Sequence, residues 1–194
     1  MQARSLCIIA EMYPAIFLDR DGVIIENLPD YVRSWEDVRF IPGALEALAR
    51  ARSSPYKIII VTNQSAVGRG ILTLEQAWEI NHRLADRIDQ AGGRIDGIFM
   101  CPHAPQDHCE CRKPQPGLLL QAASELSINL SRSVLVGDAI SDLLAGQAAG
   151  LRDSILVRSG RGREQELMAH PPGLKPFKTY DNLLDALRTI LPET

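Results

Sequence analysis

Residues 16–22 read Ile16-Phe17-Leu18-Asp19-Arg20-Asp21-Gly22. The bulky apolar residues predict a short buried strand. Two carboxylates follow this strand, two residues apart, and Gly22 permits a sharp turn. Because alternate residues of an extended chain point the same way, we expect Asp19 and Asp21 to project toward one site.

Four more apolar runs follow this stretch, and segments in which apolar residues recur at helical spacing separate them. The runs are Ile58-Ile59-Ile60-Val61, Ile98-Phe99-Met100, Val134-Leu135-Val136 and Ile155-Leu156-Val157. The expected helices cover residues 43–52, 117–127, 141–149 and 181–191, and another begins after Thr73, which forms a capping box with Gln76. Continuous apolar strands alternating with helices predict an α/β fold, a three-layer, doubly wound and mainly parallel sheet.

Composition and charge narrow the class of protein. The chain has 194 residues, of which 45% are hydrophobic and 23% charged, which predicts one globular domain over residues 1–194. The net charge of −3 argues against nucleic-acid and membrane partners. The short apolar run at residues 6–10 predicts neither a signal peptide nor a membrane span, so we expect a cytoplasmic protein. The sequence does not give the oligomeric state, for which we expect a monomer.

Polar residues stand at the carboxyl ends of the predicted strands, where ligands bind in doubly wound sheets. They are Thr62-Asn63-Gln64-Ser65 after the second run, Gly137-Asp138 after the fourth, with Asp142 one helical turn later, and Arg112-Lys113-Pro114 before a helix. Each group alone also fits a turn, a solvated lysine or a helix cap. Together they indicate phosphoryl transfer: one carboxylate of the Asp19/Asp21 pair can attack phosphorus while the other moves the proton. Lys113 can neutralise phosphoryl oxygens, and Asp138 with Asp142 can offer carboxylates to Mg²⁺.

A cluster of metal-binding side chains lies just before Lys113. Cys101, His103, Cys109 and Cys111 supply three sulfurs and one imidazole, a complete set of ligands for a structural Zn²⁺ ion. We therefore predict a zinc-binding loop at about residues 101–111. By tying down this loop, the ion would position the cations that follow it.

The four motifs resemble those of the haloacid dehalogenase (HAD) superfamily of phosphohydrolases. They are Phe17-Leu18-Asp19-Arg20-Asp21-Gly22, Val61-Thr62-Asn63, Lys113-Pro114 and Val136-Gly137-Asp138, and the resemblance covers roughly residues 15–158. The run from Cys101 to Pro114 is similar to that of a subgroup that contains heptose bisphosphate phosphatases and histidinol-phosphate phosphatases. The resemblance implies a Rossmann-like HAD fold with a zinc loop and no large cap domain.

The same resemblance implies roles for individual residues. Asp19, Asp21, Thr62 and Lys113 are the implied catalytic residues. Asp19, Asp21 and Asp138 are the implied Mg²⁺ ligands, and Cys101, His103, Cys109 and Cys111 the implied Zn²⁺ ligands. The implied substrate-binding residues are Arg20, Asn27, Tyr31, Asn63, Gln64, Ser65 and Arg112. Some members carry a lysine directly after the metal-binding aspartate, where this chain has Ala139.

The subgroup implies a small phosphorylated sugar as substrate. We expect removal of the 7-phosphate of a heptose 1,7-bisphosphate, a step toward nucleotide-heptose for surface polysaccharide. Two alternatives remain open: a histidinol-phosphate phosphatase with the same active-site residues, and a non-catalytic phosphate-binding module on the same fold. Residues 159–175 are rich in Gly, Pro and Arg, which predicts a flexible segment. Arg158, Arg161 and Arg163 could attract a second phosphate, but charge runs of this kind usually form a solvated basic turn, which is the reading we favour.

Overall fold

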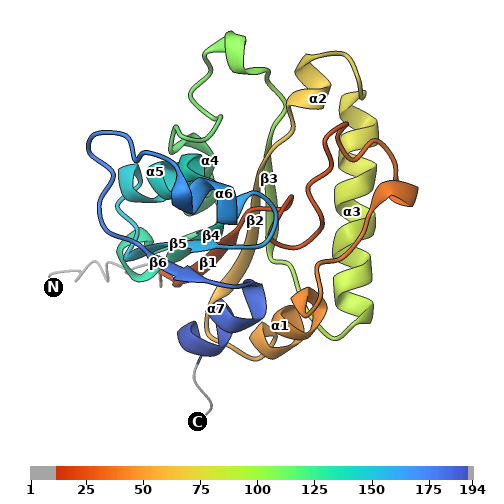
Figure 1. The fold of residues 1–194 in the computed structure, drawn as a ribbon. Helices are drawn as coiled ribbons and strands as arrows, with labels where there is room; N and C mark the ends of the chain where they lie inside the picture. The colour runs from red at the N-terminus through yellow and green to blue at the C-terminus, as the bar shows by residue number, and fades with distance from the viewer. Residues whose placement is uncertain (1–11, 192–194) are drawn as a thin grey trace, which may run out of the picture.

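The computed structural model describes residues 12–191, which form one six-stranded sheet with helices on both faces (Figure 1). The strands are β1 (Ala15–Leu18), β2 (Lys57–Asn63), β3 (Gly97–Cys101), β4 (Val134–Gly137), β5 (Asp153–Val157) and β6 (Lys178–Tyr180). The helices are α1 (Ala44–Ala51), α2 (Ser65–Gly68), α3 (Leu74–Gln90), α4 (Gly117–Leu126), α5 (Ile140–Ala148), α6 (Gly162–Leu167) and α7 (Leu183–Ile190). Short 3-10 turns lie at Trp35–Asp37, Pro105–Asp107 and Leu130–Arg132. The apolar run at residues 6–10 lies outside the described residues.

All strand pairs are parallel, and the strand order is β3-β2-β1-β4-β5-β6. The predicted α/β fold with a doubly wound sheet is therefore confirmed, and residues 12–191 contain no separate cap domain. Because the chain runs outward from β1 in both directions, the carboxyl ends of β1 and β4 flank the crevice where such sheets bind ligands. A backbone hydrogen bond of 3.0 Å from Asp19 N to Val136 O joins the two strands at that edge.

Alternate side chains of the central strands enter two separate hydrophobic clusters. Ile16 and Leu18 pack with α1, α3 and α7 on one face, whereas Phe17 packs with α4 and α5 on the other. Figure 1 shows these two helical layers on either side of the sheet. Burial on both faces explains why the strands are continuous apolar runs rather than alternating ones.

The predicted helix after Thr73 begins where the capping box places it. The Thr73 hydroxyl accepts from the backbone N–H of Gln76 at 3.2 Å, and the Gln76 side chain accepts from the N–H of Thr73 at 2.8 Å. Both N–H groups would otherwise lack partners at the first turn of α3. The helix then buries Ile80, Leu84 and Ile88 against the sheet.

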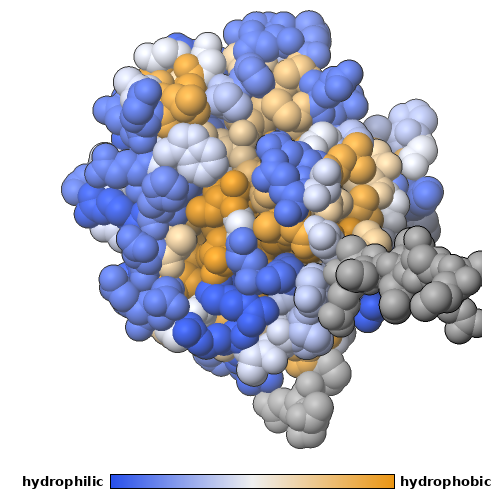
Figure 2. Space-filling view, turned by 180° about the vertical axis from the view of Figure 1, so that it is seen from behind, coloured by the Kyte–Doolittle hydropathy of each residue, from blue (hydrophilic) through white to orange (hydrophobic). Residues whose placement is uncertain are grey.

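β3 forms one edge of the sheet, and its residues are half-buried or buried. When the molecule is seen from behind, apolar residues gather in the middle of the visible surface (Figure 2). A groove along β3 is lined by Trp78, residues 97–100, Gln121, Glu125 and Leu126. Among residues 12–191, no helix combines the length and the apolar character needed to cross a membrane.

The packing of α3 leads to a test of the core. Leu84 is fully buried in the cluster between α3 and the sheet, so we expect Leu84→Ala to lower the free energy of unfolding by about 2–5 kcal/mol. Urea denaturation measures this loss. Leu120→Ala, which truncates a leucine that is 48% exposed on α4, serves as the control and should cost much less. Equal losses in both variants would contradict the assignment of Leu84 to the core.

Candidate active site

The carboxyl ends of the central strands bring three of the four predicted catalytic residues, Asp19, Asp21 and Lys113, into one pocket of about 350 Å³, whereas Thr62 lies outside its lining. Asp19 directly follows β1, Thr62 and Asn63 end β2, and Asp138 follows β4. The pocket is lined by Asp19, Arg20, Asp21, Asn27, Leu28, Tyr31, Val32, Asn63, Gln64, Ser65, Arg112, Lys113, Pro114, Ser141, Asp142 and Arg161. All the residues predicted to bind substrate are in this lining, and Thr62 is fully buried.

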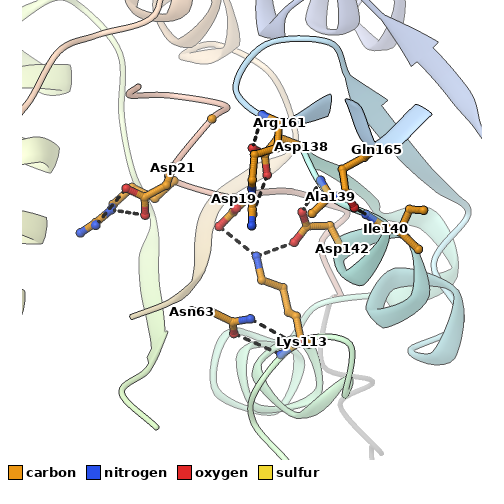
Figure 3. Close-up of polar contacts among 12 residues, drawn as sticks. Asp19, Asp21, Asn63, Lys113, Asp138, Ala139, Ile140, Asp142, Arg161 and Gln165 are labelled. Carbon is orange, nitrogen blue, oxygen red and sulfur yellow. Dashed lines mark hydrogen bonds and ion pairs between the residues drawn. The ribbon is translucent and has the colours of Figure 1, made fainter. Parts of the chain in front are cut away.

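Lys113 holds two carboxylates together at the bottom of the site (Figure 3). Its Nζ lies 2.9 Å from Asp19 Oδ1 and 2.6 Å from Asp142 Oδ1, and it donates a 2.8 Å hydrogen bond to Val61 O. Burial alone would lower the pKa of the ammonium, but the charges of Asp142 and Asp19 raise it above its ordinary value. Lys113 therefore stays positively charged, as a group that binds phosphoryl oxygens must.

Asp19 is only 6% exposed, and burial is the main cause that raises its pKa. Lys113 opposes this effect, while the neighbouring charges of Asp142 and Asp21 add to it, and the pKa rises from 3.8 to about 6. Above that pH the side chain is an ionised carboxylate with a single strong counter-ion. Such a group is a suitable nucleophile once its target is in place.

The side chain of Asn63 fixes the backbone of Lys113. Asn63 Nδ2 donates to Lys113 O, and Lys113 N donates to Asn63 Oδ1, both at 3.1 Å. This pair of bonds joins the end of β2 to the segment before α4. Asn63 lines the pocket as predicted, and its amide is used to position Lys113.

A buried hydrogen-bond network orients Asp21. Arg20 is 1% exposed, and its guanidinium donates to Asp21 Oδ2 at 3.0 Å, to Gln64 Oε1 at 2.8 Å and to Asn81 Oδ1 at 2.8 Å. Gln64 Nε2 in turn donates to Asp21 Oδ2 and to Thr62 Oγ1, both at 2.8 Å. These partners bind most of the Arg20 donors, so the network holds Asp21 in place beside Asp19.

Three carboxylates form a cluster with the geometry of a cation site. Oxygens of Asp19, Asp138 and Asp142 lie within 4.8 Å of one another, and all three residues are buried. The Asp21 carboxylate is not in this cluster, because it is turned toward Arg20 and Gln64. Hard oxygen donors of this kind fit Mg²⁺, which is typically held by one or two carboxylates together with substrate phosphate.

The Cys/His loop gathers its four donor atoms at one point. The sulfur of Cys111 lies 3.1 Å from that of Cys101 and 3.4 Å from that of Cys109, and Nδ1 of His103 lies 3.3 Å from Cys111 Sγ. All three cysteines are free. Bonds of about 2.3 Å to a tetrahedral ion place sulfur ligands about 3.8 Å apart, close to this spacing. The four residues can therefore hold a metal ion.

The remaining predicted substrate residues surround the mouth of the pocket. Asn27 is exposed, and Tyr31 is half-buried with a positive φ of 65°. Ser65 begins α2, and Arg112 Nη1 donates a 3.3 Å hydrogen bond to His103 O at the Cys/His loop. Arg112 is therefore the group through which that loop meets the pocket.

Comparison with known proteins places these features in a family. Residues 110–186 match the HAD-hydrolase-like family model. The chain is 43% identical over 145 residues to the D-glycero-beta-D-manno-heptose-1,7-bisphosphate 7-phosphatase of Helicobacter pylori, covering 74% of this chain and 83% of the relative. It is 36% identical to the enzyme of that name from Neisseria meningitidis, covering 92% and 95%. The chain belongs to the heptose bisphosphate phosphatase family of the HAD superfamily.

A solved structure of this family resembles the chain over most of its length. The D,D-heptose 1,7-bisphosphate phosphatase of B. bronchiseptica, solved in complex with magnesium and phosphate, superposes with a TM-score of 0.86 at 33% identity. The match covers 93% of this chain and 99% of that one. The resemblance to HAD phosphatases that the sequence motifs indicate is therefore confirmed.

Two residues of the pocket emerge from the structure more clearly than from the sequence. The sequence predicts Asp142 only as a second carboxylate near Asp138 that could face a cation. In the structure, Asp142 is an ion-pair partner of Lys113. Arg161, interpreted from sequence as part of a solvated turn, lines the pocket and contacts Asp138. The predicted flexible segment in which it lies contains α6. The contacts of Asp142 and Arg161 depend on how distant segments pack in three dimensions, so the local sequence does not reveal them.

The raised pKa of Asp19 makes stability depend on pH. Ionising this buried carboxylate opposes folding above its folded-state pKa of about 6, and the opposition is lost below 3.8. We therefore expect Asp19→Asn to stabilise the metal-free protein at pH 8 by about 1–3 kcal/mol, and the gain should shrink as the pH falls to 5. Urea unfolding in a chelator measures it, with the exposed Asp86→Asn as control. A gain that is the same at both pH values would contradict the assignment.

Proposed function

We propose that this chain is a Mg²⁺-dependent phosphomonoesterase that removes the 7-phosphate of D-glycero-β-D-manno-heptose 1,7-bisphosphate. One geometric observation carries the activity: the Asp19 carboxylate lies 2.9 Å from the Lys113 ammonium in a pocket that Asp21 also lines. A nucleophile, a group that neutralises phosphoryl charge and a proton carrier thus share one site. The substrate is supported by the names of the relatives.

The reaction follows from the positions of Asp19 and Asp21. An Asp19 oxygen attacks phosphorus, the bond from phosphorus to the sugar oxygen breaks, and protonated Asp21 gives its proton to that oxygen. An aspartyl-phosphate results. Asp21, now a carboxylate, takes a proton from a water molecule that attacks the same phosphorus, which releases inorganic phosphate and restores Asp19.

Lys113 and the acidic cluster lower the electrostatic cost of this reaction. The ammonium neutralises the negative oxygens of the transferring phosphoryl group. Of the predicted Mg²⁺ ligands Asp19, Asp21 and Asp138, the buried oxygens of Asp19 and Asp138 fit the ion. The Asp21 carboxylate is turned toward Arg20 and Gln64, so we assign this side chain to proton transfer. When bound, the ion reduces the repulsion between the anionic nucleophile and the anionic phosphate.

We assign zinc to the cluster of Cys101, His103, Cys109 and Cys111, because three sulfurs and one imidazole match a closed structural site. This ion would join the end of β3 to the residues just before Lys113. Its function is therefore to position Arg112 and Lys113 rather than to react. We further propose that residues 1–194 form one domain, since residues 12–191 build a single sheet with its helices, and that the protein acts as a monomer.

A panel of phosphate esters tests the proposed activity. With Mg²⁺, we expect the highest kcat/KM for the heptose 1,7-bisphosphate, above histidinol phosphate and simple sugar phosphates. Asp19→Asn should abolish phosphate release, and Asp21→Asn should lower kcat by about 10²–10⁴-fold. A preference for histidinol phosphate would refute the substrate but keep the mechanism. Binding without any turnover would favour the non-catalytic module, and full activity of Asp19→Asn would refute the nucleophile.

Metal analysis tests the zinc assignment. We expect about one zinc per purified chain, and we expect Cys111→Ser to lose the metal and to unfold at a lower temperature, because metal binding stabilises the folded loop. Elemental analysis and thermal denaturation measure the two effects. Cys7→Ser, at the cysteine that is far from the other three in sequence, is the matched control. A wild-type protein that is free of zinc and keeps its stability in a chelator would refute the site.

A further inference from the structure

The loop after β5 packs directly onto the acidic centre. Ser159 Oγ donates a 2.7 Å hydrogen bond to Gly22 O, in the turn that follows Asp19 and Asp21. Gly160 has a φ of +56°, and a Cβ there would lie 2.5 Å from Asp138 Oδ2. The loop therefore has no room for a side chain at this point, and its backbone places the next residue, Arg161, beside Asp138.

Arg161 surrounds the carboxylate of Asp138 (Figure 3). Its backbone N–H donates to Oδ2 at 2.9 Å, and its guanidinium lies 3.1 Å from Oδ1 through Nη2 and 3.4 Å from Oδ2 through Nε. Asp138 is fully buried. Within residues 12–191, all the hydrogen bonds that the Asp138 carboxylate accepts come from Arg161.

The two kinds of contact from Arg161 have different consequences. The backbone N–H orients Asp138 whatever the side chain does. The guanidinium, by contrast, belongs to a side chain that is 50% exposed and that lines the same pocket as Asp19 and Lys113. The guanidinium can therefore leave Asp138 for an anion in the pocket without releasing the carboxylate from its backbone partner.

A divalent cation and the guanidinium are competing partners for Asp138. Both carry positive charge, and both need the lone pairs of the same two oxygens. A phosphate group in the pocket carries the opposite charge and accepts bidentate hydrogen bonds from arginine. Mg²⁺ at Asp138 thus makes the guanidinium available, and a phosphorylated ligand supplies its new partner.

We propose that Arg161 is a substrate-binding residue that couples metal and substrate: Mg²⁺ displaces its guanidinium from Asp138, and the guanidinium then binds an anionic oxygen of the phosphorylated ligand. This inference rests on the proposed function only in placing Mg²⁺ at Asp138. It does not depend on which sugar carries the phosphate. By linkage, the metal strengthens phosphate binding by the same factor as phosphate strengthens metal binding.

Binding measurements on Arg161→Gln test the coupling without turnover. Mn²⁺, followed by electron paramagnetic resonance, serves as the probe for the metal site, and inorganic phosphate, followed by calorimetry, as the probe for the anion site. Without phosphate, we expect the variant to bind Mn²⁺ several-fold more tightly than wild type. With saturating Mn²⁺, we expect it to bind phosphate about 10-fold or more weakly, the loss of a hydrogen bond between charged groups.

Two further variants control for structure and charge. Arg163→Gln removes an exposed arginine of α6, the helix that begins directly after Arg161. Arg163 does not line the pocket, so both affinities should stay at wild-type values. Arg161→Lys keeps the charge and should recover part of the phosphate affinity. In steady-state kinetics with saturating Mg²⁺, Arg161→Gln should raise KM more than it lowers kcat.

Each other outcome would overturn the inference. Weaker Mn²⁺ binding by Arg161→Gln would mean that the guanidinium only orients Asp138. Unchanged affinities for both probes would make Arg161 a surface residue. The proposed function is tested separately: if wild type releases no phosphate from the heptose 1,7-bisphosphate, the Mn²⁺ and phosphate affinities still decide the role of Arg161.

Discussion

The ion pairs of Lys113 are the interaction on which the site depends. Its buried ammonium joins Asp19, at the end of β1, to Asp142, on α5. Removing a charge from water is costly, so a buried carboxylate without a counter-ion would take up a proton and lose its nucleophilic character. Lys113 reduces that cost for both aspartates. The same ammonium neutralises phosphoryl oxygens, so one group serves both folding and binding.

Lys113 contacts two carboxylates at once, so its backbone must be held in a fixed position. Two features of the structure hold it there. Asn63 binds both the N–H and the C=O of Lys113, which ties that residue to the end of β2. The Cys/His loop holds the chain from the other direction, because Cys101 ends β3 and Cys111 lies just before Lys113. Two neighbouring strands thus fix one side chain, and no separate cap domain is needed in the described residues to place it.

The sequence predicts the strand ends well, since each buried strand is a continuous apolar run followed by a polar residue. It does not predict β6, Lys178–Tyr180, which has only three residues and little burial. Nor does it predict the contact of Arg161 with Asp138. In sequence, Arg161 is one of three arginines in a glycine-rich segment, and only the close approach of Gly160 to Asp138 in space distinguishes it from its neighbours.

Three cations of the site contact its four carboxylates. Arg20 pairs with Asp21, Lys113 with Asp19 and Asp142, and Arg161 with Asp138. Adding a divalent cation alone would bring positive charge next to Arg161, and adding a phosphate dianion alone would bring negative charge next to the buried aspartates. Both additions together leave the net charge unchanged. Because charges interact strongly where water is excluded, the site favours the metal and the phosphate as a pair over either one alone.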